Sequence, residues 1–225
     1  MTRLPAMARD RPIRIHAVCS AIVWCCGLNA AWLALSLAGG VVLGVGPATV
    51  TASILVRRRG RGDTVRARDF WATWRREFWP GNAVTAPVTA VVALLGYDAG
   101  IWRTGPLWLV TVVALAVAIG AGSYVAPMYA FYRLPLRAYP VKALRFALAR
   151  PVPTVLLLLV FAALSAATAV APVLAVTVSV GAWLQVSTWL CVRFFTENED
   201  RLADAAQPGP GRPERLLPTE PLRIR

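Results

Sequence analysis

The chain has 225 residues, of which 57% are hydrophobic and only 16% are charged. A soluble domain is roughly 45–50% apolar and about 25% charged, so the composition argues against a soluble globular protein. The formal net charge is +13, but the arginines stand beside long apolar runs. There the positive-inside rule accounts for them without a nucleic-acid partner. We therefore expect an all-α, polytopic bundle of transmembrane helices in a lipid bilayer.

The N-terminal part predicts a basic arm and two apolar segments. Residues 1–14 carry four arginines and should lie in the cytoplasm. The apolar run that follows is too long for one helix, because a bilayer core of about 30 Å needs about 20 residues. The Gly39-Gly40 pair supplies a break, which predicts spans at 15–38 and 41–56. The second segment is short and either crosses or re-enters; we favour crossing, because the arginine-rich loop after it then returns to the cytoplasm.

Residues 65–79 show the pattern of an amphipathic helix, with aromatic side chains on one side and arginines on most of the rest. The residues of this aromatic face and its acidic neighbour are Phe70, Trp71, Trp74, Phe78 and Asp69. Such a pattern predicts an interfacial helix at the lipid headgroups or a cytoplasmic helix packed on the bundle. We expect Pro80-Gly81 to end this helix, and we take its aromatic face as a candidate surface for lipid or a partner.

Two further hairpins complete the predicted membrane domain, which extends over residues 15–195. The basic segment 132–151 between them should return to the cytoplasm and form a second short amphipathic helix that stops at Pro151. Six spans put both termini in the cytoplasm; the alternative is five spans, with 41–56 re-entrant or fused. The tail 196–225 has few apolar residues and is expected to be disordered. The four remaining spans are predicted at 82–97, 106–131, 153–170 and 173–192.

Few residue patterns along the chain are typical of catalytic or binding sites. No ionisable residue falls at the middle of a predicted span, and no GxSxG, HExxH, P-loop or GxGxxG motif is present. The four cysteines include no CxxC pair and fit buried small residues better than metal ligands. We predict no catalytic residue, no metal, no cofactor and no enzymatic activity. Asn29 and Gln185 are polar residues near the middle of spans, and each either bridges helices or contacts a substrate.

One compact motif is suited to begin a new helix after the glycine break, and we name it the restart motif. Proline fits the first turn of a helix, where its missing N–H is no loss, and the threonine can bond to the backbone near the break. The restart either gives a kinked helix or lines a cavity within the membrane. The motif consists of Gly46, Pro47, Ala48 and Thr49.

A family resemblance follows from these residues. Asn29, then Trp32-Leu33, the glycine break, the restart motif, Ala52, Asp69-Phe70-Trp71 and Phe78 resemble the YesL-like family of bacterial membrane proteins. The resemblance covers about residues 20–80 closely and the layout of spans to about residue 195. This chain has Gly39-Gly40 where many members carry Leu-Pro, which makes the first break softer.

The resemblance implies a bacterial plasma-membrane protein that supports carbohydrate uptake, because family members are often encoded near carbohydrate ABC importers. The expected function is a non-enzymatic accessory that docks on an ABC importer permease. The alternative is an autonomous small-solute transporter or channel, with Asn29 and the restart motif along its path. The sequence leaves the substrate and any homo-oligomer open.

Overall fold

The computed structural model describes residues 10–206, with side chains described for residues 18–201, and no strand occurs among them. The prediction of an all-α fold is confirmed. The helices in chain order are α1 (Asp10–Ala38), α2 (Val45–Gly60), α3 (Ala67–Ile101), α4 (Pro106–Phe131), α5 (Ala138–Ala149), α6 (Pro151–Val170), the π-helical segment η2 (Ala175–Ser179) and α7 (Val180–Ala206).

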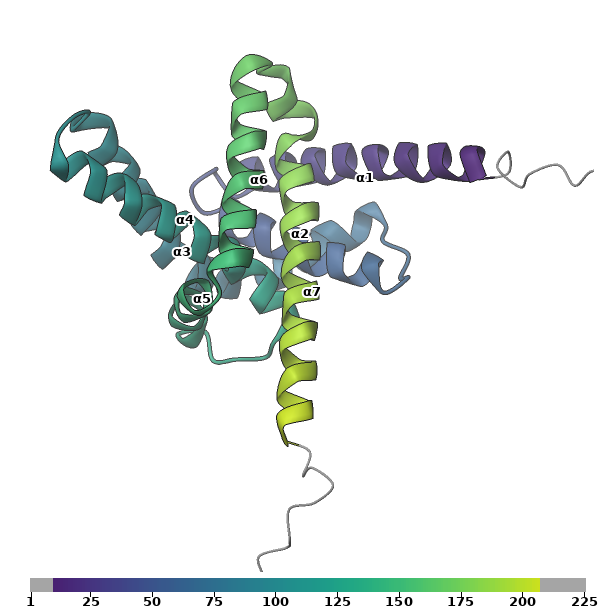
Figure 1. Ribbon diagram of the computed structural model, residues 1–225. Helices are drawn as coiled ribbons and strands as arrows, with labels where there is room; N and C mark the ends of the chain where they lie inside the picture. Colours follow the sequence, from purple (N-terminus) through teal and green to yellow (C-terminus); the bar gives the residue numbers. More distant parts are fainter. Residues whose placement is uncertain (1–9, 207–225) are drawn as a thin grey trace, which may run out of the picture.

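The central element is α2, which packs against α1, α3, α4 and α7. Nine of its 16 residues are buried. Figure 1 shows α3 and α4 as one antiparallel pair that slants away from the centre, and α6 and α7 as a second pair. In the same view α1 runs crosswise to α6 and α7. The hairpins therefore diverge from a shared junction around α2.

Five stretches are long and apolar enough to cross a membrane, judged by length and composition. This result supports a multi-pass membrane protein. Their number agrees with the five-span alternative, and six spans are not confirmed, because α2 is only 16 residues or roughly 24 Å long. The five stretches are Val18–Ala38, Ala67–Ile101, Pro106–Phe131, Pro151–Val170 and Ala175–Arg201.

The predicted end of a helix at Pro80-Gly81 is wrong. Helix α3 continues through Pro80 and Pro87 to Ile101, so a separate interfacial helix at 65–79 is not confirmed. Proline removes one hydrogen bond from a helix interior and displaces a carbonyl, but tertiary contact holds α3 together here. A Cβ atom on Gly81 would lie 2.9 Å from Cα of Pro47. The two helices therefore touch where the sequence suggested a break.

Other boundaries also differ from the prediction. Helix α1 begins at Asp10, inside the expected arm, and α7 continues to Ala206, so the predicted disorder is wrong for residues 196–206. Side-chain bonds hold this extension: the Tyr132 hydroxyl donates to Glu199 at 2.7 Å, and Arg150 donates to Asn198 at 2.7 Å. The rest of the predicted arm and tail, residues 1–9 and 207–225, lies outside the described residues.

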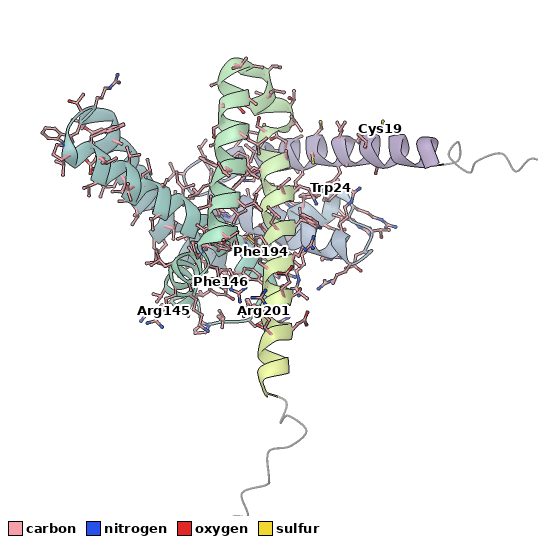
Figure 2. All side chains as sticks on the ribbon, viewed as in Figure 1. Cys19, Trp24, Arg145, Phe146, Phe194 and Arg201 are labelled. Carbon is pink, nitrogen blue, oxygen red and sulfur yellow. The ribbon has the colours of Figure 1, made fainter. Side chains whose placement is uncertain are left out.

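The predicted short helix before Pro151 is present as α5. It packs on α4 and buries Tyr139, whereas its larger aliphatic side chains are exposed: Val141, Leu144 and Leu148. Phe146 of α5 lies beside α7 (Figure 2), with its ring centroid 5.3 Å from that of Phe195. Tyr124 of α4 completes this cluster and is fully buried. The largest core cluster thus joins α4, α5 and α7.

Candidate functional site

The restart motif lies at the buried start of α2 and ties three helices together. Thr49 Oγ1 donates to the Val45 carbonyl at 2.8 Å and accepts a bond from Trp32 Nε1 at 3.0 Å. Pro47 is the third residue of α2, where its missing N–H leaves the Leu43 carbonyl without its usual helical partner. Hydrogen bonds at the motif thus run from α1 to α2 and within α2.

The freed carbonyl of Leu43 is satisfied by a residue that the sequence analysis did not single out. Asn82 of α3 donates its Nδ2 to Leu43 at 2.9 Å and to the Phe78 carbonyl at 2.9 Å. No local pattern signals this pairing, because the carbonyl of Leu43 is freed by Pro47 on another helix. The restart motif is therefore held from α3 as well.

Asn29 is fully buried and bridges α1 to the start of the last helix. Its Nδ2 donates to the carbonyls of Val176 at 2.6 Å and Ala175 at 3.3 Å, both in the π-helical segment. Its Oδ1 accepts the backbone N–H of Gly181 at 3.0 Å. All three bonds go to backbone, so both ends of the amide are occupied.

Gln185 also connects helices, at a half-buried position. Its Oε1 accepts a bond from Trp24 Nε1 of α1 at 2.8 Å. The guanidinium of Arg59 lies 4.1 Å from the centroid of the same Trp24 ring, a cation–π geometry. Gln185 is thus one end of a chain that leads through Trp24 to the arginines at the end of α2.

The predicted aromatic face mostly turns inward. Trp74 is 7% exposed, and it packs with Phe70 and Phe78 against Leu35 and Ala48. These three rings therefore contact α1 and α2, which the sequence could not place beside them. The surface available to a partner is narrower than the sequence predicted.

Asp69 has a local role at the start of α3. Its carboxylate accepts the backbone N–H of Arg66 at 2.9 Å, which closes half of a capping box. A negative charge in the first turn also stabilises the helix through its dipole. The acidic residue of the predicted face thus fixes where α3 begins.

Four exposed residues of α3 form a surface that we name the Trp–Arg stripe. They lie within one side of the helix, because spacings of three and four residues return to the same face. Trp71 is 49% exposed and stacks on Trp74 with centroids 5.2 Å apart, and Trp79 is 74% exposed. The stripe consists of Arg68, Trp71, Arg75 and Trp79.

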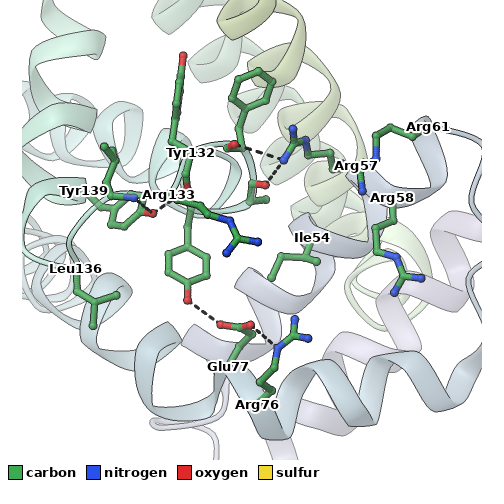
Figure 3. A pocket seen from close by; sticks show the side chains of 14 residues that line it. Ile54, Arg57, Arg58, Arg61, Arg76, Glu77, Tyr132, Arg133, Leu136 and Tyr139 are labelled. Atoms are coloured by element: carbon green, nitrogen blue, oxygen red, sulfur yellow. Dashed lines mark hydrogen bonds and ion pairs between the residues drawn. The ribbon is translucent and has the colours of Figure 1, made fainter.

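A cavity of about 660 Å³ lies between the end of α2, α3 and the α4–α5 loop, and we name it the arginine cavity. Its organising pair is Glu77, buried on α3, and Tyr129, whose hydroxyl donates to Glu77 at 2.7 Å (Figure 3). Arg57 donates to the last carbonyls of α4, at Ala130 and Phe131. A cation suits the negative end of a helix dipole.

The arginine cavity also contains Tyr132, at its α4–α5 rim. Burial, with the hydrogen bond and nearby charge of Glu199, raises the pKa of the Tyr132 hydroxyl above its ordinary value. The hydroxyl therefore stays protonated and donates at physiological pH. The sequence analysis missed Glu77, whose signal was an acid directly after Arg75 and Arg76 in the arginine-rich start of α3.

The described part of the chain offers no metal site and four thiols. Among residues 18–201, no group of three or more His, Cys, Asp or Glu side chains could hold a metal ion. The four cysteines are free thiols; Cys191 is buried, as expected for a small apolar residue, whereas Cys19 is exposed.

The chain is similar to a known protein and to a described protein family. The chain is 32% identical over 148 residues to a protein of Bacillus subtilis (strain 168) named "Uncharacterized protein YesV", across 62% of this chain and 71% of the relative. No solved structure gives a significant match. Residues 25–99 match the family described as "Protein of unknown function, DUF624", a region that contains Asn29, the restart motif and the Trp–Arg stripe. The chain therefore belongs to the DUF624 family.

Proposed function

We propose that this protein is a non-enzymatic accessory of a carbohydrate importer of the ABC type, and that it is YesL-like within its family. The resemblance of residues 20–80 implies this setting, because YesL-like proteins are often encoded near such importers. The proposal includes a bacterial plasma membrane and cytoplasmic termini, since the arginine-rich segments then share one side.

The Trp–Arg stripe is the observation that carries the docking part of the proposal. Its tryptophans are 49% and 74% exposed, although three neighbouring aromatic rings pack inside the protein. Tryptophan and arginine are the residue types that most often dominate binding energy at protein interfaces. Two arginines beside them favour a partner surface with carboxylates. We therefore assign the stripe to an importer permease that presents acidic side chains beside the cytoplasmic membrane surface.

The interior supports an accessory role. Asn29 and Thr49, the polar residues expected along a path, donate their polar hydrogens to the backbone. The side-chain oxygen of Asn29 also accepts the backbone N–H of Gly181. A substrate would have to displace these bonds to reach either side chain, which costs more than contact with a preformed polar wall.

A second candidate, a small-solute transporter or channel, rests on a different cavity. A space of about 260 Å³ between α2, α3, α4 and the last two helices is lined by Gly46 and Thr49 of the restart motif. Thr85, Thr89 and Ser123 add hydroxyl oxygens to the same wall. Such a wall suits a small polar solute.

Affinity purification in a gentle detergent tests the accessory proposal. We would compare the wild type with the double variant Trp71→Ser/Trp79→Ser and with Trp102→Ser. Trp102 is a matched control, because it is 57% exposed but follows α3 at the opposite end of the helix. We expect an importer permease to copurify with the wild type and Trp102→Ser in near-stoichiometric amount, and to fall at least about tenfold with the double variant, as for two interface hot spots.

Two results would contradict the proposal. The first is purification of the wild type alone, or only with itself, followed by solute uptake in vesicles that contain no other protein; the transporter then becomes the better assignment. The second is equal recovery of the permease with the double variant. In that case the tryptophans contact lipid headgroups, a common position for this residue in membrane proteins.

A further inference from the structure

The arginine cavity has the size and charge of a binding site that the proposed function does not use. Its volume of about 660 Å³ lies within the roughly 300–1,000 Å³ of small-molecule sites. Its wall contains five arginines but one carboxylate, Glu77. The arginines are contributed by the end of α2, by α3 and by the loop after α4: Arg57, Arg58, Arg61, Arg76 and Arg133.

Two of these arginines already have partners. Arg57 donates to the carbonyls of Ala130 and Phe131, and its guanidinium lies 4.5 Å from the Phe131 ring centroid. Arg76 pairs with Glu77 at 2.8 Å. Glu77 also accepts the Tyr129 hydroxyl, so both carboxylate oxygens are occupied. The carboxylate in the wall is thus unavailable to the remaining arginines.

Three arginines remain with little or no compensation. Arg58 and Arg61 share Asp63 at 3.6 and 3.8 Å, longer than the about 2.7–2.9 Å of a charge-assisted hydrogen bond. Within residues 18–201, Arg133 forms no ion pair. Figure 3 shows its guanidinium pointing into the cavity, toward the side of Ile54 and Glu77. The cavity therefore has an uncompensated positive charge.

We propose that the arginine cavity binds a phosphate group through Arg58, Arg61 and Arg133. Guanidinium groups offer paired N–H donors that match the oxygens of phosphate. Three positive charges suit a dianionic phosphate ester better than a single carboxylate. Ile54 and Leu136, together with nearby tyrosine rings, provide an apolar wall for the organic part of the ligand.

The phosphate could belong to a lipid headgroup or to a soluble phosphate ester. Basic pockets beside transmembrane helices on the cytoplasmic side are suited to anionic headgroups. The cavity lies where α2 and α4 end, which is the place that a headgroup would reach if both helices end at the membrane surface. Phosphate binding is independent of docking, because none of the three arginines belongs to the Trp–Arg stripe.

Binding of two probes to the full-length protein in neutral detergent tests the proposal. Inorganic phosphate, titrated at constant ionic strength, represents the soluble source and is measured by calorimetry. Phosphatidylglycerol in phosphatidylcholine mixed micelles represents the headgroup and is measured by native mass spectrometry. The test variants are Arg133→Gln and Arg133→Lys. The matched control is Arg145→Gln, an exposed arginine on the outer side of α5 that does not line the cavity (Figure 2).

We expect saturable binding of at least one probe. Arg133→Gln should weaken it at least about tenfold, since the charge and a charge-assisted hydrogen bond to the phosphate are both lost. Arg133→Lys should bind the probe with an affinity between those of the wild type and Arg133→Gln, because lysine retains the charge without the paired donors. Arg145→Gln should change the dissociation constant by less than about twofold, as distant exposed charges are screened.

The pattern of binding distinguishes the sources. Saturation by the lipid only assigns a headgroup, saturation by phosphate only assigns a soluble ester, and saturation by both assigns the phosphate group itself. Absence of saturable binding in both arms would overturn the proposal. An equal loss of affinity with Arg133→Gln and Arg145→Gln would also overturn it, because the probe would then be attracted by the overall positive charge and not by the cavity.

Discussion

At the scale of single residues, Asn29 shows how a polar side chain in one span can complete the backbone of another. The π-helical segment η2 shifts the hydrogen-bond register before α7, which leaves carbonyls to be satisfied. The Asn29 amide nitrogen donates to two of them. Gly181 permits the approach: a Cβ on it would lie 2.0 Å from the Cys25 carbonyl oxygen.

The first residue-scale prediction concerns the substitution Asn29→Leu. It removes two bonds to η2 and one to α7 and leaves the Gly181 N–H without Asn29 as its acceptor, so we expect the free energy of unfolding to fall by about 1–3 kcal/mol. The control Gln185→Leu removes one bond, from Trp24, and should cost under about 1 kcal/mol. Circular dichroism during titration with a denaturing detergent measures both.

An equal or smaller loss for Asn29→Leu than for Gln185→Leu would contradict the bridging role. Unchanged stability together with lost solute uptake would place Asn29 in contact with a substrate, which favours the transporter. The comparison therefore also separates the two candidate functions.

At the scale of elements, α3 is the helix that departs most from expectation. It extends for 35 residues and combines the predicted amphipathic segment with the span after it. Its first part buries Trp74 against α1 and α2, while its later part is largely exposed, as a lipid-facing helix would be. One continuous helix thus connects the Trp–Arg stripe to the exposed apolar part of α3.

A distance between spin labels at residues 72 and 94 tests this continuity. At 1.5 Å per residue, an unbroken helix places the two backbone positions about 33 Å apart. A right-angle break at Pro80 would shorten this to about 24 Å. Ala72 and Leu94 are both exposed, and the four native cysteines would first be replaced. Pulsed electron resonance gives the distance; a population centred near the shorter value would refute the continuous helix.

The sequence predicts the helical class, the break at Gly39-Gly40 and the end of α5 before Pro151, because these depend on composition and on local backbone preferences. Whether Pro80 ends a helix depends instead on the contact of Gly81 with Pro47, which no local pattern encodes. The inward turn of Trp74 likewise needs α1 and α2 as neighbours. The arginine cavity is a tertiary feature, assembled from three separate segments.

At the scale of the whole molecule, the helix directions bear on which helices cross a membrane, and the arginines bear on which side the loops lie. Figure 1 shows α1 crosswise to α7, so one membrane normal cannot be parallel to both. Length and composition therefore do not decide which of the five candidate stretches cross. The sidedness of two loops follows more directly. Arg57 at the end of α2 is bonded to the carbonyls of Ala130 and Phe131, which holds the two arginine-rich segments together.

Labelling of single cysteines with a membrane-impermeant maleimide tests the resulting topology. We expect Thr64→Cys and Leu136→Cys to be labelled only when the cytoplasmic face is accessible, since Arg57 places both loops on one side and the positive-inside rule makes it the cytoplasm. Thr104→Cys, at the other end of α3, should react in intact cells. A cysteine at Thr2 then reports whether the chain crosses the membrane an even number of times between residues 2 and 64, with cytoplasmic labelling expected for the predicted basic arm. Labelling of positions 64 and 136 from opposite sides would contradict the contact between α2 and α4 and, with it, the arginine cavity.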